Sequence, residues 1–178
     1  MVLQSGRTEA GRAVLTDHPG RRKKHYDRSV ELLSCRLQNS AGETTENVAA
    51  GEDVTISLCY QMRSENTITA PLSFAVMICD EDGRRLSHCD SDVVETPFEG
   101  MPKHGEVRCV IRRLSLTPGS YSLALACKVG VMWSDQVQDA LRFEVMPGPY
   151  YASGKLPPIG IAGLVLMDYE WERCEECQ

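Results

Sequence analysis

The sequence lacks a long hydrophobic run and a secretory leader. Its longest uncharged apolar stretch, Ile159 to Met167, falls well below the roughly 18 residues of a membrane-spanning helix. The first 20 residues contain no apolar core followed by a small-residue cleavage site. The chain is 42% hydrophobic and 25% charged, which is typical of a globular protein, so we expect a cytoplasmic location.

Motifs of catalysis and nucleotide binding are also absent. The patterns GxxxxGK[ST], GxSxG, HExxH and GxGxxG do not occur. The four histidines lie in the N-terminal segment or beside expected turns, where histidine is usually exposed. Paired aspartates such as Asp80/Asp82 and Asp90/Asp92 fall next to expected hairpins, where aspartate serves the turn. We therefore expect a chain that is not an enzyme and needs no cofactor; a hydrolase with paired aspartates is the weakest alternative.

Cysteine is abundant, with eight residues, but the spacing of a complete zinc site is missing. Cys174 and Cys177 form a CxxC at an acidic end without a second CxxC or a CxxH, so no metal site is expected within one chain. A site shared across a dimer axis is a less favoured alternative. Free cysteine behaves as a small hydrophobe in the apolar strand-like runs that hold Cys35, Cys59, Cys79, Cys109 and Cys127.

Charge is unevenly distributed. Residues 1–25 hold six bases and two acids, a net +4, so the rest carries −10 of the total −6. An acidic body argues against a nucleic-acid surface. Residues 1–27 mix glycine, proline and charges without helical or strand periodicity, which predicts a flexible linker or an added lead segment, with something attached upstream.

From Ser29 onward, short strands alternate with turn signals. Residues 52–62 alternate apolar and polar side chains, and residues 71–90 predict a hairpin around an Asp-Gly turn. Further strands are expected within residues 105–129, joined through a Pro-Gly turn, and within residues 139–148. The pattern predicts an all-β domain over residues 28–148: an immunoglobulin-like sandwich of two antiparallel sheets, with a barrel as the alternative.

Two expected strands carry small or mildly apolar residues on both faces. A solvent-facing side would usually show Lys, Glu and Thr there, so we expect another segment or a shallow ligand to cover it. The C-terminal run is the candidate cover. The out-of-phase positions concerned are Ser122, Ala124, Ala126 and Lys128 on one strand, and Ala75, Met77 and Cys79 on the other.

Side chains suited to sugar recognition occur at strand ends. A sugar has an apolar C–H face and a rim of hydroxyls, which an aromatic ring flanked by hydrogen-bonding groups matches. Trp133 lies in an expected loop, and capping the core or stacking on a ligand are equally open to it. The predicted ligand-binding residues are Gln61, Arg63, Arg112, Lys128, Trp133 and Asp135.

The order of the segments "VAAGEDVTISLCYQ", "PLSFAVMICDEDGRRL", "GEVRCVIRRLSLTPGSYSLALAC", "DALRFEVMPG" and "GIAGLVLMDYEWE" resembles the C-terminal domain of the ATP-binding subunit of O-antigen ABC transporters, the Wzt type. The resemblance covers roughly Ser29 to Glu172. It implies a cytoplasmic carbohydrate-binding domain that a linker joins to an ATPase domain and, through it, to a transmembrane transporter subunit. It also implies binding to the non-reducing end of a lipid-linked polysaccharide. The high cysteine content, the "RCEECQ" extension and the lack of a nucleotide-binding domain depart from the family pattern; the last departure fits an isolated domain.

Residues 149–178 predict a hinge rich in glycine and proline followed by one more strand. An unpaired apolar strand is an aggregation hazard, so it must add to a sheet edge. From the residues alone, its own edge and a partner's edge are equally plausible; the resemblance implies a homodimer that exchanges this strand. A dimerisation or adaptor domain without ligand is the alternative function. The interface expected for the homodimer comprises Ile161, Leu164, Val165, Leu166 and Met167.

Overall fold

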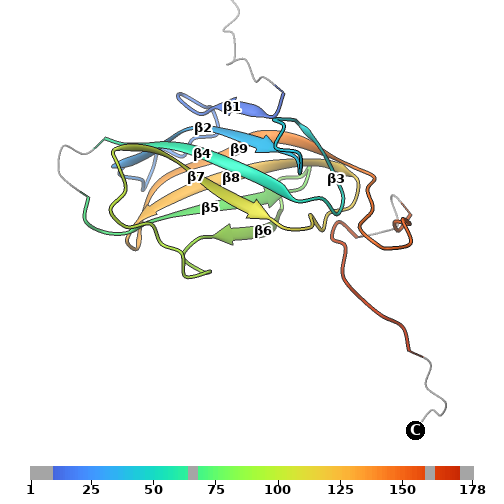
Figure 1. Cartoon of the computed structure of the whole chain (residues 1–178). Coiled ribbons are helices and arrows are strands. Elements are labelled where there is room, and N and C mark those ends of the chain that lie inside the picture. The colour runs from blue at the N-terminus through green and yellow to red at the C-terminus, as the bar shows by residue number, and fades with distance from the viewer. Residues whose placement is uncertain (1–9, 64–67, 159–162, 173–178) are drawn as a thin grey trace, which may run out of the picture.

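A computed structural model of the chain describes residues 10–63, 68–158 and 163–172. These residues form nine strands and no helix (Figure 1), so they include no helix that could span a membrane. The strands are β1 (Arg12–Val14), β2 (Val30–Gln38), β3 (Asn47–Ala49), β4 (Val54–Met62), β5 (Leu72–Cys79), β6 (Arg85–Asp90), β7 (His104–Ile111), β8 (Gly119–Val129) and β9 (Met132–Met146).

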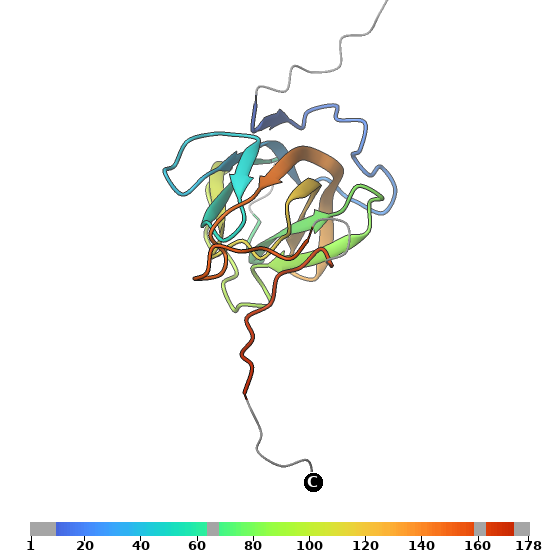
Figure 2. The same ribbon diagram turned by 90° about the vertical axis from the view of Figure 1, so that its right-hand side faces the viewer.

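The strands form two sheets that pack face to face. One sheet has the order β1-β2-β4-β7 and the other the order β3-β9-β8-β5-β6. All neighbours are antiparallel except β3 and β9, which run parallel. Figure 2 shows the two layers from one end of the strands. The prediction of an all-β sandwich of two sheets, rather than a barrel, is confirmed.

Alternation along the strands builds the core between the sheets. On β4, Val54, Ile56, Leu58 and Tyr60 are buried, whereas Thr55 between them is half-buried. A strand turns successive side chains to opposite faces, so this alternation directs one set inward. The residue pattern therefore predicted the facing of β4 correctly.

The β5–β6 hairpin closes as the Asp-Gly signal predicts. Gly83 has a φ of 76°, in the left-handed region that glycine adopts without a Cβ clash. The Asp80 carboxylate accepts the backbone N–H of Arg84 at 2.8 Å and its Nε at 2.9 Å. Asp80 thus serves the turn.

The outer face of the five-stranded sheet carries a second, small apolar cluster. The prediction that this face is covered is confirmed for the cluster, because all of its members are buried. The described part of the C-terminal run lies elsewhere, however, and pairs with residues 115–117. The cluster consists of Ala75, Met77, Cys79, Ala124 and Ala126.

The N-terminal segment, residues 10–28, is part of the sandwich. β1 pairs with β2, and Leu15 is fully buried. Farther along, the backbone N–H groups of Arg22 and Arg28 donate to the carbonyls of Gln136 and Ser134 on β9. The expected flexible linker is therefore wrong for residues 10–27. β3 pairs only with the C-terminal end of β9, so the outer edge of the N-terminal half of β9 needs other backbone partners. The N-terminal segment supplies them.

The described C-terminal run docks on its own chain. Leu166 donates its N–H to the carbonyl of Ser115, and Thr117 donates to that of Leu164, around a single bridge between Leu116 and Val165. The Leu166 side chain is buried in the main core. Residues 167–172 then lead away from the sandwich (Figures 1 and 2). Of the residues expected at a dimer interface, Ile161 lies outside the described residues.

Candidate functional site

A hollow of about 670 Å³ lies between residues 16–28 and the ends of β2 and β4. We call it the N-terminal cleft. Its lining includes the ring of Tyr26 and the imidazole of His18. Its charged side chains, four bases against two acids, are Arg21, Lys23, Arg28, Arg63, Asp17 and Glu31.

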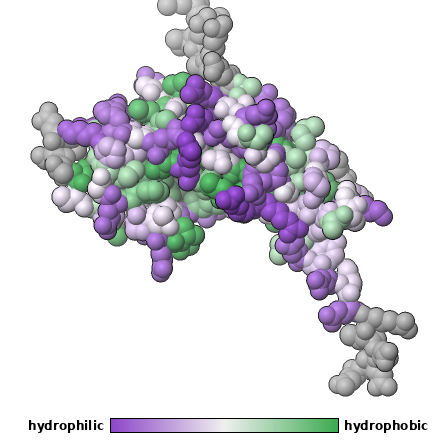
Figure 3. Space-filling model, in the orientation of Figure 1, coloured by the Kyte–Doolittle hydropathy of each residue, from purple (hydrophilic) through white to green (hydrophobic). Residues whose placement is uncertain are grey.

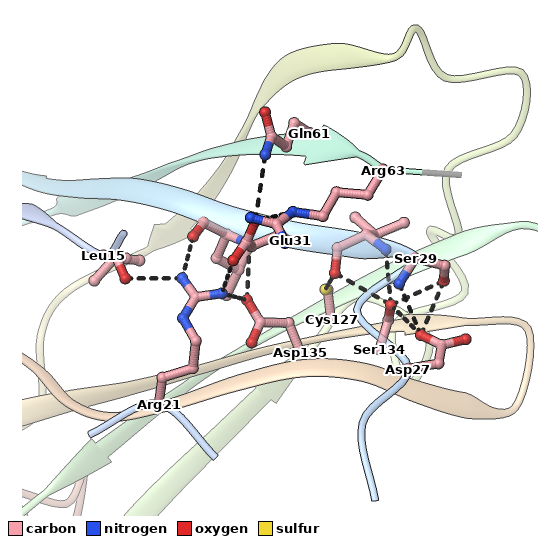
Figure 4. A network of polar contacts seen from close by, with 12 residues as sticks. Leu15, Arg21, Asp27, Ser29, Glu31, Gln61, Arg63, Cys127, Ser134 and Asp135 are labelled. Atoms are coloured by element: carbon pink, nitrogen blue, oxygen red, sulfur yellow. Dashed lines mark hydrogen bonds and ion pairs between the residues drawn. The ribbon is translucent and has the colours of Figure 1, made fainter. Parts of the chain in front are cut away.

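The buried guanidinium of Arg21 organises the inner wall of the cleft (Figure 4). Its Nη1 donates to Glu31 Oε1 at 2.8 Å and to Asp135 Oδ2 at 2.6 Å. Its Nη2 donates to the carbonyls of Leu15 at 2.8 Å and Leu32 at 2.6 Å. One side chain thereby joins the N-terminal segment, β2 and β9 through charge-assisted and backbone hydrogen bonds.

Glu31 connects this interior to the mouth of the cleft. Its Oε2 accepts from Arg63 Nε at 2.5 Å and from Gln61 Nε2 at 3.3 Å, and its Oε1 faces Arg21. Three of the six predicted ligand-binding residues, Gln61, Arg63 and Asp135, therefore meet in one network through Glu31 and Arg21 (Figure 4). Half of the Arg63 side chain remains exposed, so its guanidinium is open to a ligand.

Asp135 is fully buried and so lies out of reach of a ligand. Burial raises the pKa of its carboxyl, against the opposite effects of the Leu32 N–H at 2.9 Å and the Arg21 guanidinium. Asp135 Oδ1 and Arg21 Nε find no hydrogen-bond partner among the described residues. The role of Asp135 is to hold Arg21, and through it Glu31.

Ser134 ties the end of the N-terminal segment to β9. Its Oγ donates to Asp27 Oδ1 at 2.7 Å and accepts the N–H of Val30 at 2.8 Å. Burial alone would raise the pKa of Asp27, but hydrogen bonds from Ser29 and Ser134 outweigh it and lower the pKa. These contacts set where β2 begins beside the cleft.

Trp133 and Lys128 face each other across the β8–β9 pair. The Lys128 Nζ lies 5.2 Å from the centroid of the Trp133 ring and 2.8 Å from Asp90 Oδ2. Trp133 is 39% exposed, which does not suit a core cap. Trp133 is not among the residues that line the N-terminal cleft; Ser134, the next residue on β9, turns to the opposite face and contacts Val30. Tyr26 adds a contact from its hydroxyl to Gln136 on β9.

Arg112 lies apart from the other predicted residues. Its Nη1 pairs with Asp53 Oδ2 at 2.6 Å, just before β4 begins. Gln61 and Arg63 lie at the other end of β4, a strand length away. The predicted set therefore falls into three groups: the cleft network, the Trp133–Lys128 pair and the distant Arg112.

The sequence pattern did not reveal Arg21, Glu31 or Tyr26 as site residues, because Arg21 and Tyr26 lie in a segment that reads as a linker. One signal was present in "SVELLSC", where Glu31 interrupts an apolar strand. A carboxylate buried in a strand requires a cationic partner. The cation that pairs with Glu31 depends on how residues 16–28 run in the fold, and the sequence of this segment has no periodicity that predicts its course. Among the described residues, no cluster of three or more His, Cys, Asp or Glu side chains could hold a metal ion.

Two packed sheets with a polar cleft at one end define the chain as a β-sandwich domain. The sequence matches the Wzt C-terminal domain family over residues 22–160, and the chain belongs to this family. The family is a non-catalytic C-terminal domain and implies the context of an ABC-transporter subunit. The resemblance found in the residues is thereby confirmed.

The solved structure of a Wzt C-terminal domain agrees with this chain at the level of the fold. The crystal structure of the C-terminal domain of Wzt is 14% identical, with 88% of this chain and 92% of that chain covered, at a TM-score of 0.65. An immunoglobulin-like protein from Pseudomonas aeruginosa is 14% identical, with coverage of 67% and 98%, at a TM-score of only 0.35. No curated protein sequence matches the chain.

Proposed function

We propose that the chain is the carbohydrate-binding domain of an O-antigen ABC transporter and binds the non-reducing end of a lipid-linked polysaccharide before export. An attached ATPase domain links it to a transmembrane subunit, at the cytoplasmic face of the inner membrane. The observation that carries this proposal is the N-terminal cleft, where hydrogen-bonding side chains and the ring of Tyr26 line one hollow. Family membership supplies the transport context.

The chemistry of the cleft suits a sugar. Guanidinium and ammonium groups donate to hydroxyl oxygens, and carboxylates accept from hydroxyl hydrogens. The phenol of Tyr26 in the cleft offers flat apolar surface to the C–H face of a ring, and the exposed indole of Trp133, outside the cleft lining, is a second such surface. A cleft of about 670 Å³ lies in the range of small-ligand sites and has room for a terminal sugar unit.

The side chains divide into contacting and supporting roles. Arg63 and Trp133 are exposed enough to touch the glycan, and Lys128 lies beside the Trp133 ring. Gln61 and Asp135 support the wall through Glu31 and Arg21. Arg112, at the far end of β4, takes no part in this site.

Calorimetric titration with O-polysaccharides of the source strain tests the proposal. Trp133→Ala and Arg63→Ala should each weaken binding about tenfold or more, equivalent to about 1.4 kcal/mol. Their melting temperatures should stay near that of the wild type. Trp171→Ala is a matched control, because this second tryptophan is 91% exposed in the C-terminal run. If neither calorimetry nor a glycan array detects binding, the proposal fails; release of reducing sugar would indicate a hydrolase instead.

We further propose a homodimer in which the C-terminal strand is exchanged. The run docks through one bridge, the buried side chain of Leu166, and polar contacts of Asp168 with Arg113 and of the Met167 carbonyl with Tyr151, after a long connection from Gly148. An exchanged segment would make the same contacts on the partner, with Leu164, Val165 and Met167 lining the junction. Truncation after Gly154 should yield monomers or aggregates in size-exclusion chromatography with light scattering. An unchanged soluble dimer would count against the exchange, and a dimer that binds no glycan would favour the adaptor function.

A further inference from the structure

Cys89 and Cys109 lie on the two open edges of the sandwich. Cys89 belongs to β6, the last strand of the five-stranded sheet, and Cys109 belongs to β7, the last strand of the other. Cys89 stands opposite Val76, and Cys109 stands opposite Ile56, both buried core residues. Directly opposed residues on paired strands point to the same face of a sheet. Both thiols therefore point into the space between the sheets, and toward each other.

The two thiols line the same hollow between β6 and β7. The neighbouring Cys109 thiol lowers the pKa of Cys89 to about 7. The Cys89 thiol, with burial, raises the pKa of Cys109. The pair therefore combines a thiol of lowered pKa with a second thiol in the same hollow. This is the arrangement of an attacking and a resolving cysteine.

Small reagents have a route to the pair. A hollow of about 530 Å³ opens between β6, β7 and the connecting residues 91–103, and both cysteines line it. Its mouth carries Val93 and Val94, which are largely exposed. Figure 3 shows hydrophobic surface along this edge. The hollow can admit a compact organic disulfide.

We propose that Cys89 and Cys109 form a dithiol site that reacts with low-molecular-weight disulfides and closes into an intramolecular disulfide joining β6 to β7. The Cys89 thiolate attacks one sulfur of the reagent, forming a mixed disulfide and releasing one thiolate. Cys109 loses its proton to solvent and attacks the Cys89 sulfur, releasing the second thiolate. Two protein thiols are oxidised, and one reagent disulfide is reduced to two thiols. Excess reduced thiol reverses both steps, so the pair stays open in a reducing cytoplasm.

The other described cysteines lack this combination. Burial raises the pKa of Cys35 to about 12 and also raises that of Cys127. Cys59 lies on the outer face of the four-stranded sheet, 3.9 Å from Glu106 Oε2. Cys59→Ser is therefore a matched control that removes a thiol without touching the pair.

Peptide mapping of the full chain in glutathione buffers tests the proposal. The protein is equilibrated at increasing ratios of oxidised to reduced glutathione, quenched with acid and digested with trypsin without reduction. Mass spectrometry should show residues 86–103 linked to residues 109–112. Cys109→Ser should instead retain glutathione on Cys89, and Cys59→Ser should leave the linkage intact. The oxidised wild type should melt about 5–10 °C higher than the reduced protein, a gain that Cys109→Ser should lack.

Two results would overturn the proposal. One is the absence of the linked peptides at the highest oxidised ratio, including a case in which only Cys174 and Cys177 become linked. The other is glutathione that stays on Cys89 of the wild-type chain without resolution. Near-ultraviolet circular dichroism of Cys109→Ser, compared with the reduced wild type, confirms that the variant is folded.

Discussion

The N-terminal segment and the C-terminal run lie against the same sandwich in different ways. Residues 10–28 bury Leu15 and Arg21, and they pair with strands of both sheets. Residues 163–172 bury only Leu166 and expose Met167 and Trp171. The first segment is part of the domain wall, whereas the second is an attachment to it.

The difference lies in the kind of anchor. Arg21 joins four acceptors inside the sandwich, so its removal leaves the buried Asp135 carboxylate without a cation and Glu31 with Arg63 alone. The C-terminal run has one apolar anchor and an exposed ion pair between Arg113 and Asp168 at 2.7 Å. Exposed ion pairs contribute little stability. Segments held by a buried polar network should therefore unfold with the domain, and segments held by one side chain should detach locally.

Arg21→Met should have the largest effect. It leaves Asp135 and Glu31 buried without their shared cation, which should lower the free energy of unfolding by about 3–5 kcal/mol. Chemical denaturation at neutral pH measures this loss. Arg112→Met is the matched control and should cost less than about 1 kcal/mol, because the Arg112–Asp53 pair is exposed. Equal losses of stability in the two variants would contradict the distinction between a buried polar anchor and an exposed ion pair.

Leucine truncation in the two segments should rank second. Leu15→Ala should cost about 3 kcal/mol, because Leu15 is fully buried in a wall that cannot collapse around it. Leu166→Ala should cost about 2 kcal/mol or less, since the run can detach once its anchor is lost. Hydrogen exchange should then show faster exchange at the Leu166 and Thr117 amides and unchanged core strands. Faster exchange throughout the core of Leu166→Ala would show that the run belongs to the cooperative domain.

The contribution of Asp27 should depend on pH. The pKa of the Asp27 carboxyl is lowered in the folded protein, so the ionised carboxylate stabilises the fold at pH values above 3.8, its ordinary pKa. This stabilisation is lost as the pH falls through the lowered pKa of the folded protein. Asp27→Asn should therefore cost about 1 kcal/mol or less at pH 7. The difference between the variant and the wild type should shrink as the pH falls below 3.8. Urea denaturation at pH 7 and at acidic pH makes the comparison, and an undiminished loss at acidic pH would assign the effect to packing.

Trp171→Ala should have the smallest effect on stability. The side chain is 91% exposed, so truncation should change the free energy of unfolding by less than about 0.5 kcal/mol. Thermal unfolding of this variant beside Leu166→Ala separates the docked part of the run from the projecting part. A loss above about 1 kcal/mol would show that the indole packs against another surface, such as a second copy of the chain.

Strong local patterns predicted much of the fold. The alternation over Val54–Met62 set the inward face of β4, and the Asp-Gly pair set the β5–β6 turn. For the candidate site, the residues pointed to Gln61, Arg63 and Asp135, which the structure brings into one network. They did not separate supporting from exposed roles, because burial at a strand end depends on the segment that covers it.

Local patterning thus determined most of the strands, the facing of β4 and the family to which the chain belongs. It did not mark β1 or β3, and it placed Trp133 in a loop, whereas Trp133 lies on β9. Tertiary structure decided that residues 10–28 close the wall, that Glu31 meets Arg21, and that Arg112 lies a strand length from the cleft. It also decided that Cys89 and Cys109 line one hollow at the open edge. The physical reason is that alternation is a property of successive residues. The partner of a buried charge or thiol is set by how distant segments pack, and the spacing of residues along the chain does not specify that packing.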